Sequence, residues 1–151
     1  MDSFNDIKKL FDFDVDSILD DIFEMNRISE KVIEFNQEQL LEGRDALNQS
    51  IVTIGGSPYR PYTAKIRESI GLPTDRVTLR FRGDFYKTFE VVMVSEGYEI
   101  KADFRKDNGS ILDNFTSEYD FLGLDDSSLT ELVMEFIYPL LSKMIRSNIG
   151  L

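Results

Sequence analysis

The sequence predicts an α+β fold: a small, mainly antiparallel sheet over residues 76–106, with a long N-terminal helix (16–42) and a C-terminal helix (126–148) packed on one face. In both helical segments, apolar residues recur at intervals of three and four. In residues 76–106, apolar and polar side chains alternate. The chain has 151 residues, which predicts one domain, placed at 14–151. The alternative is an all-helical bundle that carries a hairpin.

A short aromatic segment precedes this domain. Residues 1–13 place Phe4, Phe11 and Phe13 among charged residues, at a spacing that allows a short amphipathic helix. Three exposed phenylalanines would be unfavourable on a free tail. We therefore expect residues 1–13 to be a docking arm that packs on its own domain or on a neighbour.

The longest helix is predicted over residues 14–43. Acidic and serine residues can cap its start, and Gly43 can end it, because glycine readily adopts the left-handed conformation found after helix C-termini. A straight helix of this length would exceed about 40 Å, more than the width of a domain of this size. We expect either a break near Asn26–Arg27 or a part of the helix that packs against another chain.

Residues 44–75 are predicted to be rich in loops. Prolines and glycines interrupt this segment, and residues 63–70 can form two helical turns that end at Gly71. The run 57–62 holds two tyrosines between prolines. We interpret it as a packed connector in preference to a ligand-binding loop.

The strand signal begins at residue 76. Residues 76–82 alternate arginine or threonine with apolar side chains, which predicts a half-buried strand. Residues 85–88 can form one helical turn, and the apolar run 89–94 predicts a central strand that pairs with residues 98–105 in a hairpin. Asp107-Asn108-Gly109 predicts a further turn.

The C-terminal helix is predicted over residues 125–148. Asp125 or Ser128 can cap it, the latter in a capping box with Glu131, and a broad apolar stripe follows. Pro139 lies within the helix and is expected to kink it, because proline lacks the N–H that the helix would use.

The net charge of −11 is unevenly distributed. Residues 1–45 carry 5 basic and 13 acidic side chains, residues 46–106 carry 10 and 7, and residues 107–151 carry 2 and 8. Such a negative chain disfavours non-specific binding to nucleic acid, because phosphates repel it. The acidic segments can be a solvated surface, or they can meet the basic middle segment of another copy.

The composition excludes several kinds of chemistry. The chain has no Cys and no His, which removes disulfides, thiol nucleophiles, Cys/His metal sites and histidine-based triads. No run approaches the roughly 20 apolar residues of a membrane span, and the acidic N-terminus lacks the features of a signal peptide. We expect an intracellular protein with no membrane association, catalytic residues, metal or cofactor.

One group of residues fits a nuclease. Asp84, Glu99 and Lys101 would place two carboxylates and a lysine on adjacent strands, where they can hold Mg²⁺ and activate water. Glu-x-Lys is also common on the polar face of any hairpin, so we interpret these residues as a solvated charge ladder. A metal-dependent nuclease remains an alternative.

A second group is basic. Arg76, Arg80 and Arg82 fall on one side of the predicted strand, where alternate residues are about 6–7 Å apart. Further basic residues lie nearby in the sequence: Arg60, Lys65, Arg67 and Lys87. Arginine forks can contact phosphates or carboxylates. A solvent-exposed edge strand would account equally well for the three arginines.

Residues 80–91, Arg-Phe-Arg-Gly-Asp-Phe-Tyr-Lys-Thr-Phe-Glu-Val, resemble a segment of small tailed-phage virion-morphogenesis proteins of the head–tail connector and tail-completion type. In that pattern a glycine ends a strand, a short turn follows, and the chain re-enters the sheet. Four residues stand at matching positions, namely Gly83, Phe85, Thr88 and Phe89, whereas Arg82 replaces a serine or threonine. The order of predicted elements is similar over residues 30–148.

The resemblance implies a non-enzymatic structural subunit without a cofactor, made in the host cytoplasm and located in the neck or tail of a virion. Its expected partners are other copies of itself in a ring and neighbouring portal, connector or tail proteins, with contact to packaged DNA but no sequence-specific binding. The expected contacts are head-to-tail, because closed rings need two different surfaces. The candidate interface residues are Phe4, Phe11, Phe13, Arg76, Arg80, Arg82, Gly83, Phe85 and Phe89. An acidic protein that mimics DNA and inhibits a host DNA-binding enzyme is the main alternative.

Overall fold

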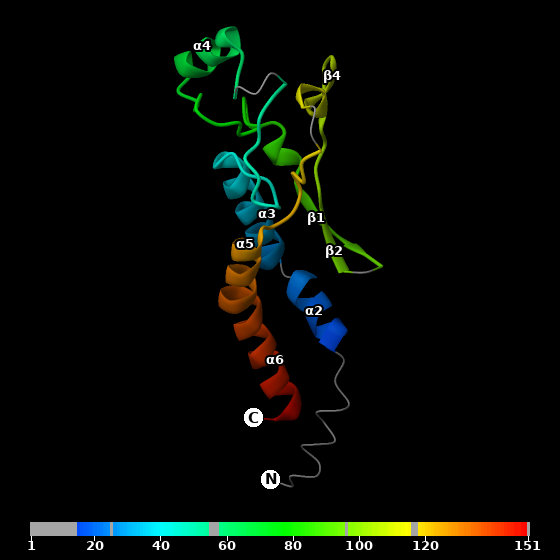
Figure 1. The fold of residues 1–151 in the computed structure, drawn as a ribbon. Helices are drawn as coiled ribbons and strands as arrows, with labels where there is room; N and C mark the ends of the chain where they lie inside the picture. The colour runs from blue at the N-terminus through cyan, green and yellow to red at the C-terminus, as the bar shows by residue number, and fades with distance from the viewer. Residues whose placement is uncertain (1–14, 25, 55–57, 96, 116–117, 151) are drawn as a thin grey trace. The chain divides into compact units, whose positions relative to one another are not determined.

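The computed structural model describes residues 15–24, 26–54, 58–95, 97–115 and 118–150. Helices and two small antiparallel sheets form an α+β fold, which confirms the predicted fold class (Figure 1). The chain divides into two compact units. One unit extends to Lys31 and resumes at Ser127, and the other spans Val32–Asp126. The predicted docking arm, residues 1–13, lies outside the described residues.

The first unit is helical. The helix predicted over 14–43 is divided into α2 (Val15–Glu24) and α3 (Asn26–Leu41), which is one of the two alternatives that its length left open. α2 packs against α6 (Tyr138–Ile149). The unit buries aliphatic side chains of the predicted stripes: Ile18, Ile22, Ile28, Leu132 and Ile137.

Pro139 is accommodated by a π-helix. α5 (Asp126–Glu131) leads into the π-helical turn η3 (Leu132–Ile137), and the N–H of Tyr138 donates to the carbonyl of Val133, five residues earlier. Proline removes the next N–H and crowds the preceding turn, and a π-turn is a common way to absorb this within a continuous helix. Because α5 begins at Asp126, Ser128 lies inside the helix and is not its N-cap.

The second unit begins with the C-terminal part of α3. Gly43 adopts a φ of +76°, its N–H donates to Leu40 O at 3.0 Å, and the N–H of Arg44 donates to Gln39 O at 3.0 Å. These two bonds form a Schellman motif. The prediction that Gly43 ends the helix is confirmed.

Short elements follow along the chain. α4 (Pro61–Ser69) confirms the helical turns predicted before Gly71, and the 3₁₀ turn η1 (Tyr86–Thr88) confirms the predicted turn after Gly83. A second 3₁₀ turn, η2 (Ile111–Asn114), begins with a capping box at Ser110.

Two hairpins form the sheets. β1 (Glu90–Val94) pairs with β2 (Gly97–Lys101) in antiparallel register, as predicted. β3 (Arg105–Lys106) pairs with β4 (Gly109–Ser110) across the predicted turn. Within the described residues each sheet has two strands, so the expectation that residues 89–94 form a central strand is wrong. The end of β1 is exposed to solvent.

The strand predicted over residues 76–82 does not form. The chain there is irregular, and Leu79 adopts a positive φ of +55°. The expected alternation of exposed polar and buried apolar side chains also fails at two positions, since Thr78 is only 1% exposed and Phe81 is 46% exposed. The physical reason is a buried arginine that binds this segment and takes the place of a strand partner, as described below.

The core of the second unit joins α3 to the segments that follow it. Its buried apolar side chains are Val32, Phe35, Leu40, Ile51, Val77, Phe85, Phe89, Ile100 and Phe121. The predicted packing of the C-terminal helix on the sheet relates one unit to the other and stays a prediction.

Candidate interaction site

Arg67 organises the most distinctive part of the second unit. It lies on α4, and its side chain is almost completely buried, with 3% of the residue exposed. Its Nε donates to Pro73 O at 2.8 Å, Nη1 to Arg80 O at 2.8 Å, and Nη2 to Thr78 Oγ1 at 3.0 Å. One guanidinium thus ties residues 73–80 to α4 through three uncharged oxygens.

Two tyrosines complete this arrangement. The ring of Tyr59 stacks on the Arg67 guanidinium, with 4.2 Å from Cζ to the ring centroid, and its hydroxyl accepts from the N–H of Thr78 at 3.1 Å. The hydroxyl of Tyr86 donates to the carbonyl of Thr78. Burial raises the pKa of the Tyr86 phenol above its ordinary value of 10.0, because the phenolate would lose hydration there. Thr78 therefore bonds to side chains where a strand would bond to its neighbour.

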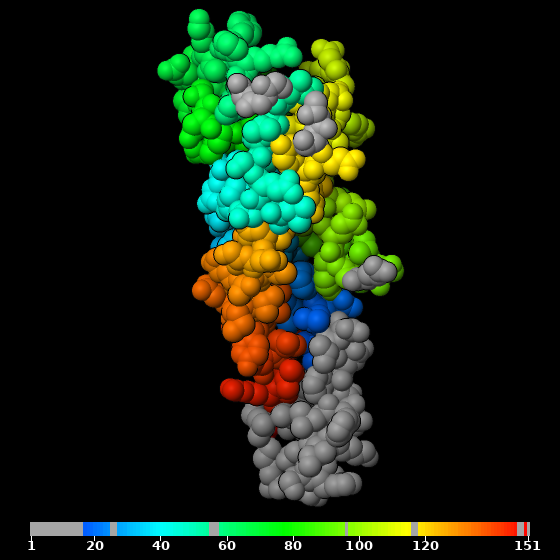
Figure 2. Space-filling model, viewed as in Figure 1, coloured from blue at the N-terminus to red at the C-terminus, as the bar shows by residue number. Residues whose placement is uncertain are grey.

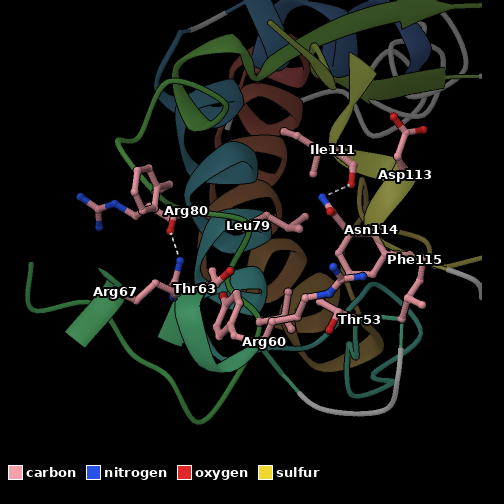
Figure 3. Close-up of a pocket in the computed structure, with 14 residues that line it drawn as sticks. Thr53, Arg60, Thr63, Arg67, Leu79, Arg80, Ile111, Asp113, Asn114 and Phe115 are labelled. Carbon is pink, nitrogen blue, oxygen red and sulfur yellow. Dashed lines mark hydrogen bonds between the residues drawn. The ribbon is translucent and has the colours of Figure 1, made fainter. Parts of the chain in front are cut away.

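A pocket of about 440 Å³ lies beside Arg67 (Figure 3). α4 and the preceding loop form one side, residues 77–81 form another, and residues 111–115 form a third. Its apolar lining includes Val77, Leu79, Ile111 and Phe115. α4 and the yellow residues around β4 both reach the surface of this unit in Figure 2.

The pocket is lined by three arginines and one acidic residue. Arg60 extends toward the side formed by Phe115, whereas the Arg80 guanidinium points outward from the labelled group (Figure 3). The Asp113 carboxylate turns away from the pocket and accepts the N–H of Ser110 at 2.8 Å. The charge on this surface is therefore positive, and it adjoins apolar side chains.

The three predicted arginines do not share one face. The Nε of Arg76 donates to Leu41 O at 2.7 Å, and its Nη1 pairs with Asp75 at 2.9 Å. Arg80 lines the pocket, and Arg82 lies 5.9 Å from the ring centroid of the exposed Phe81. The expectation of a single arginine row is wrong, because it depended on a strand that does not form.

The other predicted interface residues do not form one exposed surface either. Phe85 and Phe89 are buried, with ring centroids 5.1 Å apart, so their side chains belong to the core and offer no exposed contact surface. Gly83 has a φ of +82° and open space around it, which suits the turn before η1. The phenylalanines of residues 1–13 lie outside the described residues.

The residues of the nuclease alternative do not adopt the expected arrangement. Asp84 precedes η1 and lies in neither strand of the hairpin, and its carboxylate is 3.7 Å from Lys87 Nζ. Glu99 and Lys101 are exposed on β2, opposite Val92 and Glu90. In the described ranges, no three acidic side chains lie close enough together to hold a metal ion.

A second polar group has a structural role. On α3, Asn36 Nδ2 donates to Phe121 O at 2.9 Å and Gln39 Nε2 donates to Gly123 O at 3.0 Å, while their Oδ1 and Oε1 accept the N–H groups of Gly123 and Asp125 at 3.1 and 2.8 Å. Two buried amides thus hold the backbone of residues 121–125 as a neighbouring strand would.

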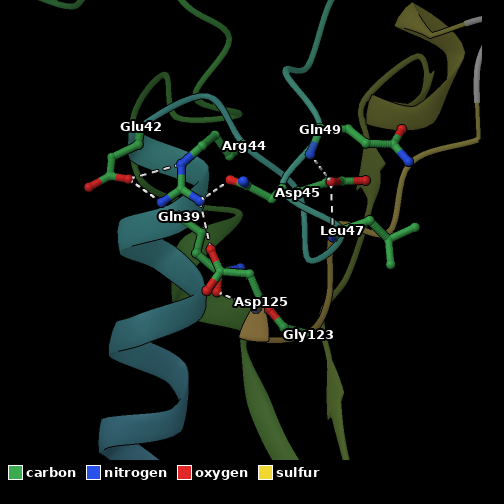
Figure 4. Close-up of polar contacts among 9 residues, drawn as sticks. Gln39, Glu42, Arg44, Asp45, Leu47, Gln49, Gly123 and Asp125 are labelled. Carbon is green, nitrogen blue, oxygen red and sulfur yellow. Dashed lines mark hydrogen bonds and ion pairs between the residues drawn. The ribbon is translucent and has the colours of Figure 1, made fainter. Parts of the chain in front are cut away.

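Asp45 and Arg44 extend this group into the loop after α3 (Figure 4). Asp45 accepts the N–H groups of Leu47 and Gln49 at 3.0 and 2.8 Å, and Arg44 pairs with Asp125 at 2.6 Å. Buried polar atoms here are satisfied by the chain itself. The group therefore explains how the unit holds together.

The sequence placed Arg67 among the basic residues near the predicted strand but did not indicate that it is buried. Periodicity did not distinguish it from Arg60 or Lys65, since charged residues of a short helix are normally exposed. The interpretation of residues 57–62 as a packed connector agrees with the contact between Tyr59 and Arg67. That tyrosine was the available signal, because aromatic faces often stack on arginine.

Comparisons with models of known protein families, with curated proteins and with solved structures find no match for this chain. The resemblance of residues 80–91 to phage connector and tail-completion proteins therefore stays a prediction. Among the helices of the described residues, none has the length and apolar character that crossing a membrane requires.

Proposed function

We propose that the protein is a non-enzymatic structural subunit that assembles with copies of itself into a ring through head-to-tail contacts. The observation that carries this proposal is the pocket beside Arg67, where a basic rim adjoins exposed apolar residues. Ile54 and Phe81, which line it, are 45% and 46% exposed. Exposed apolar side chains clustered around a concave site are typical of interaction surfaces.

The charge of the chain supports a contact between two different surfaces. The three arginines of the pocket belong to the middle segment, whereas residues 1–45 and 107–151 carry net charges of −8 and −6. A two-fold dimer would place like surfaces together, but a head-to-tail contact pairs opposite charges and closes into a ring when the rotation allows. The resemblance of residues 80–91 gives the ring its proposed place, the neck or tail of a phage virion, next to portal, connector or tail proteins.

Sedimentation velocity over a dilution series, followed by negative-stain electron microscopy of the largest species, tests the proposal. We expect a concentration-dependent species that gives ring-shaped class averages. A protein that stays monomeric at every concentration, or that stops at a two-fold dimer, would contradict the proposal.

A further inference from the structure

The pocket beside Arg67 combines two recognition elements. Its walls present aliphatic and aromatic side chains, among them Leu79, Ile111 and Phe115. Its rim carries the exposed Arg60, for which the described residues provide no carboxylate partner. The one acidic residue of the lining, Asp113, already accepts the N–H of Ser110 and turns away.

Such a pocket suits an aromatic side chain flanked by carboxylates. The ring would remove the exposed Ile54 and Phe81 from water, and a carboxylate could form a fork with the Arg60 guanidinium. The bound ring would exclude water from the neighbourhood of the Arg60 guanidinium, so this ion pair would be stronger than one on an open surface. Phosphate or nucleic acid would use the arginines but not the apolar walls.

In the acidic N-terminal part of the chain, phenylalanine and aspartate alternate directly in one segment. Residues 10–14 read Leu-Phe-Asp-Phe-Asp, so two phenylalanines alternate with two aspartates. Resting on the ring assembly proposed above, we infer that the pocket of one copy binds residues 10–14 of a second copy. Phe11 or Phe13 fills the apolar pocket, and Asp12 or Asp14 pairs with Arg60.

Disulfide trapping between two kinds of chain tests this contact, and the absence of native cysteines removes any background. One chain carries Leu10→Cys, which keeps both phenylalanines and both aspartates. The other chain carries Thr63→Cys, on the pocket side of α4, and a short tag that changes its mass. The matched control is Lys65→Cys, which is exposed on the same helix and does not line the pocket.

We expect a disulfide-linked heterodimer of the Leu10→Cys and Thr63→Cys chains, formed several-fold faster than with the Lys65→Cys chain. Equal rates with the two partners would overturn the inference. A chain that carries both Leu10→Cys and Thr63→Cys tests whether residues 10–14 occupy the pocket of their own chain. If this chain forms only an internal disulfide, at monomer mass, the pocket binds the segment of its own chain and the inference is wrong.

A set of alanine substitutions separates this inference from the proposed function. Phe11→Ala combined with Phe13→Ala should shift assembly to about tenfold higher concentration, as expected for buried anchors. Met93→Ala is the control and should leave assembly unchanged, because Met93 is exposed on β1 and does not line the pocket. If rings form equally well in all variants and no cross-link appears, the pocket contact is wrong but the ring assembly stands. If no larger species forms with the unaltered chain, both are wrong.

Discussion

At the scale of single residues, Arg67 takes the place of a strand partner for residues 78–80. Its planar guanidinium reaches Pro73 O, Thr78 Oγ1 and Arg80 O at the same time and stacks on Tyr59. A lysine carries its charge at one point and cannot reproduce this fork. The identity of this residue, beyond its positive charge, therefore determines the local structure.

We expect Arg67→Lys to lower the free energy of unfolding by about 2–3 kcal/mol, because buried acceptors lose hydrogen bonds to a charged donor. Urea denaturation followed by circular dichroism measures the change. Lys65→Met, on the exposed side of α4, is the control and should stay within about 0.5 kcal/mol of the parent. Equal stabilities for the two variants would contradict the structural role of Arg67.

The buried phenol of Tyr86 predicts a loss of stability at alkaline pH. Its pKa is raised in the folded state, so above the ordinary value of 10.0 the unfolded chain gives up this proton while the folded chain retains it. The free energy of unfolding therefore falls as the pH rises from that value toward the folded-state pKa. We expect Tyr86→Phe to reduce this alkaline loss, as measured by urea denaturation at a series of pH values.

The same substitution removes the hydrogen bond to Thr78 O and should cost about 1 kcal/mol at neutral pH. Tyr62→Phe is the control, because Tyr62 is 77% exposed. Near-ultraviolet absorbance of phenolate should show a step above the ordinary tyrosine pKa of 10.0, and Tyr86→Phe should remove that step. An unchanged titration would argue against burial of this phenol.

At the scale of elements, the C-terminus of α3 depends on Gly43 and Arg76. Gly43 has a φ of +76°, and a Cβ added there would lie 2.9 Å from Arg76 Cβ. We expect Gly43→Ala to lower the free energy of unfolding by more than the roughly 1–2 kcal/mol of left-handed strain alone. Gly71→Ala has the same strain, at a φ of +75°, but no atom within 4 Å. The difference between the two variants in thermal or urea unfolding measures the contact with Arg76, and no difference would contradict it.

The buried amides of α3 make that helix a partner for residues 121–125. We expect Asn36→Leu to cost about 1–3 kcal/mol, because Phe121 O and the N–H of Gly123 would stay buried without partners. Glu38→Leu, on the exposed side of the same helix, is the control and should have a small effect. Hydrogen exchange at the Gly123 amide should become faster in the first variant only, and unchanged exchange would contradict the contact.

At the scale of the whole molecule, charge is segregated along the chain. A basic middle segment and acidic ends favour contacts between different surfaces of two copies. Individual exposed ion pairs contribute only about 0–1 kcal/mol, so apolar contacts must provide most of the affinity. Charge then sets the orientation and the rate of association.

Reversal of one pocket charge tests the contribution of charge to assembly. We expect Arg60→Glu to weaken assembly and to reverse or remove its salt dependence, because the pocket would then repel the acidic segments. Lys65→Glu is the control: it changes the net charge equally, but Lys65 lies on α4, the helix that follows Arg60, and outside the pocket lining. Sedimentation at low and high salt compares the two, and equal effects would show that only net charge matters.

Much of the fold could be predicted from local sequence. The glycine stop at Gly43, the helical turn at residues 86–88 and both hairpins were predicted and are confirmed. The division of the long helix was one of two alternatives that its length left open. Each depends on residues close together in the chain, where periodicity and turn chemistry act directly. The candidate site was predicted less well, since of the exposed arginine row only Arg80 lines the pocket.

The sequence by itself determined the helices, the hairpins and the segregation of charge, because these depend on neighbouring residues and on composition. Tertiary structure alone decided that Arg67 is buried, that Thr78 faces inward and that residues 76–82 form no strand. The alternating pattern of that segment is compatible with a strand, but its hydrogen bonds go to side chains of Tyr59, Arg67 and Tyr86. A backbone group bonds to whichever partner the fold brings near, and a partner distant in sequence leaves no local pattern.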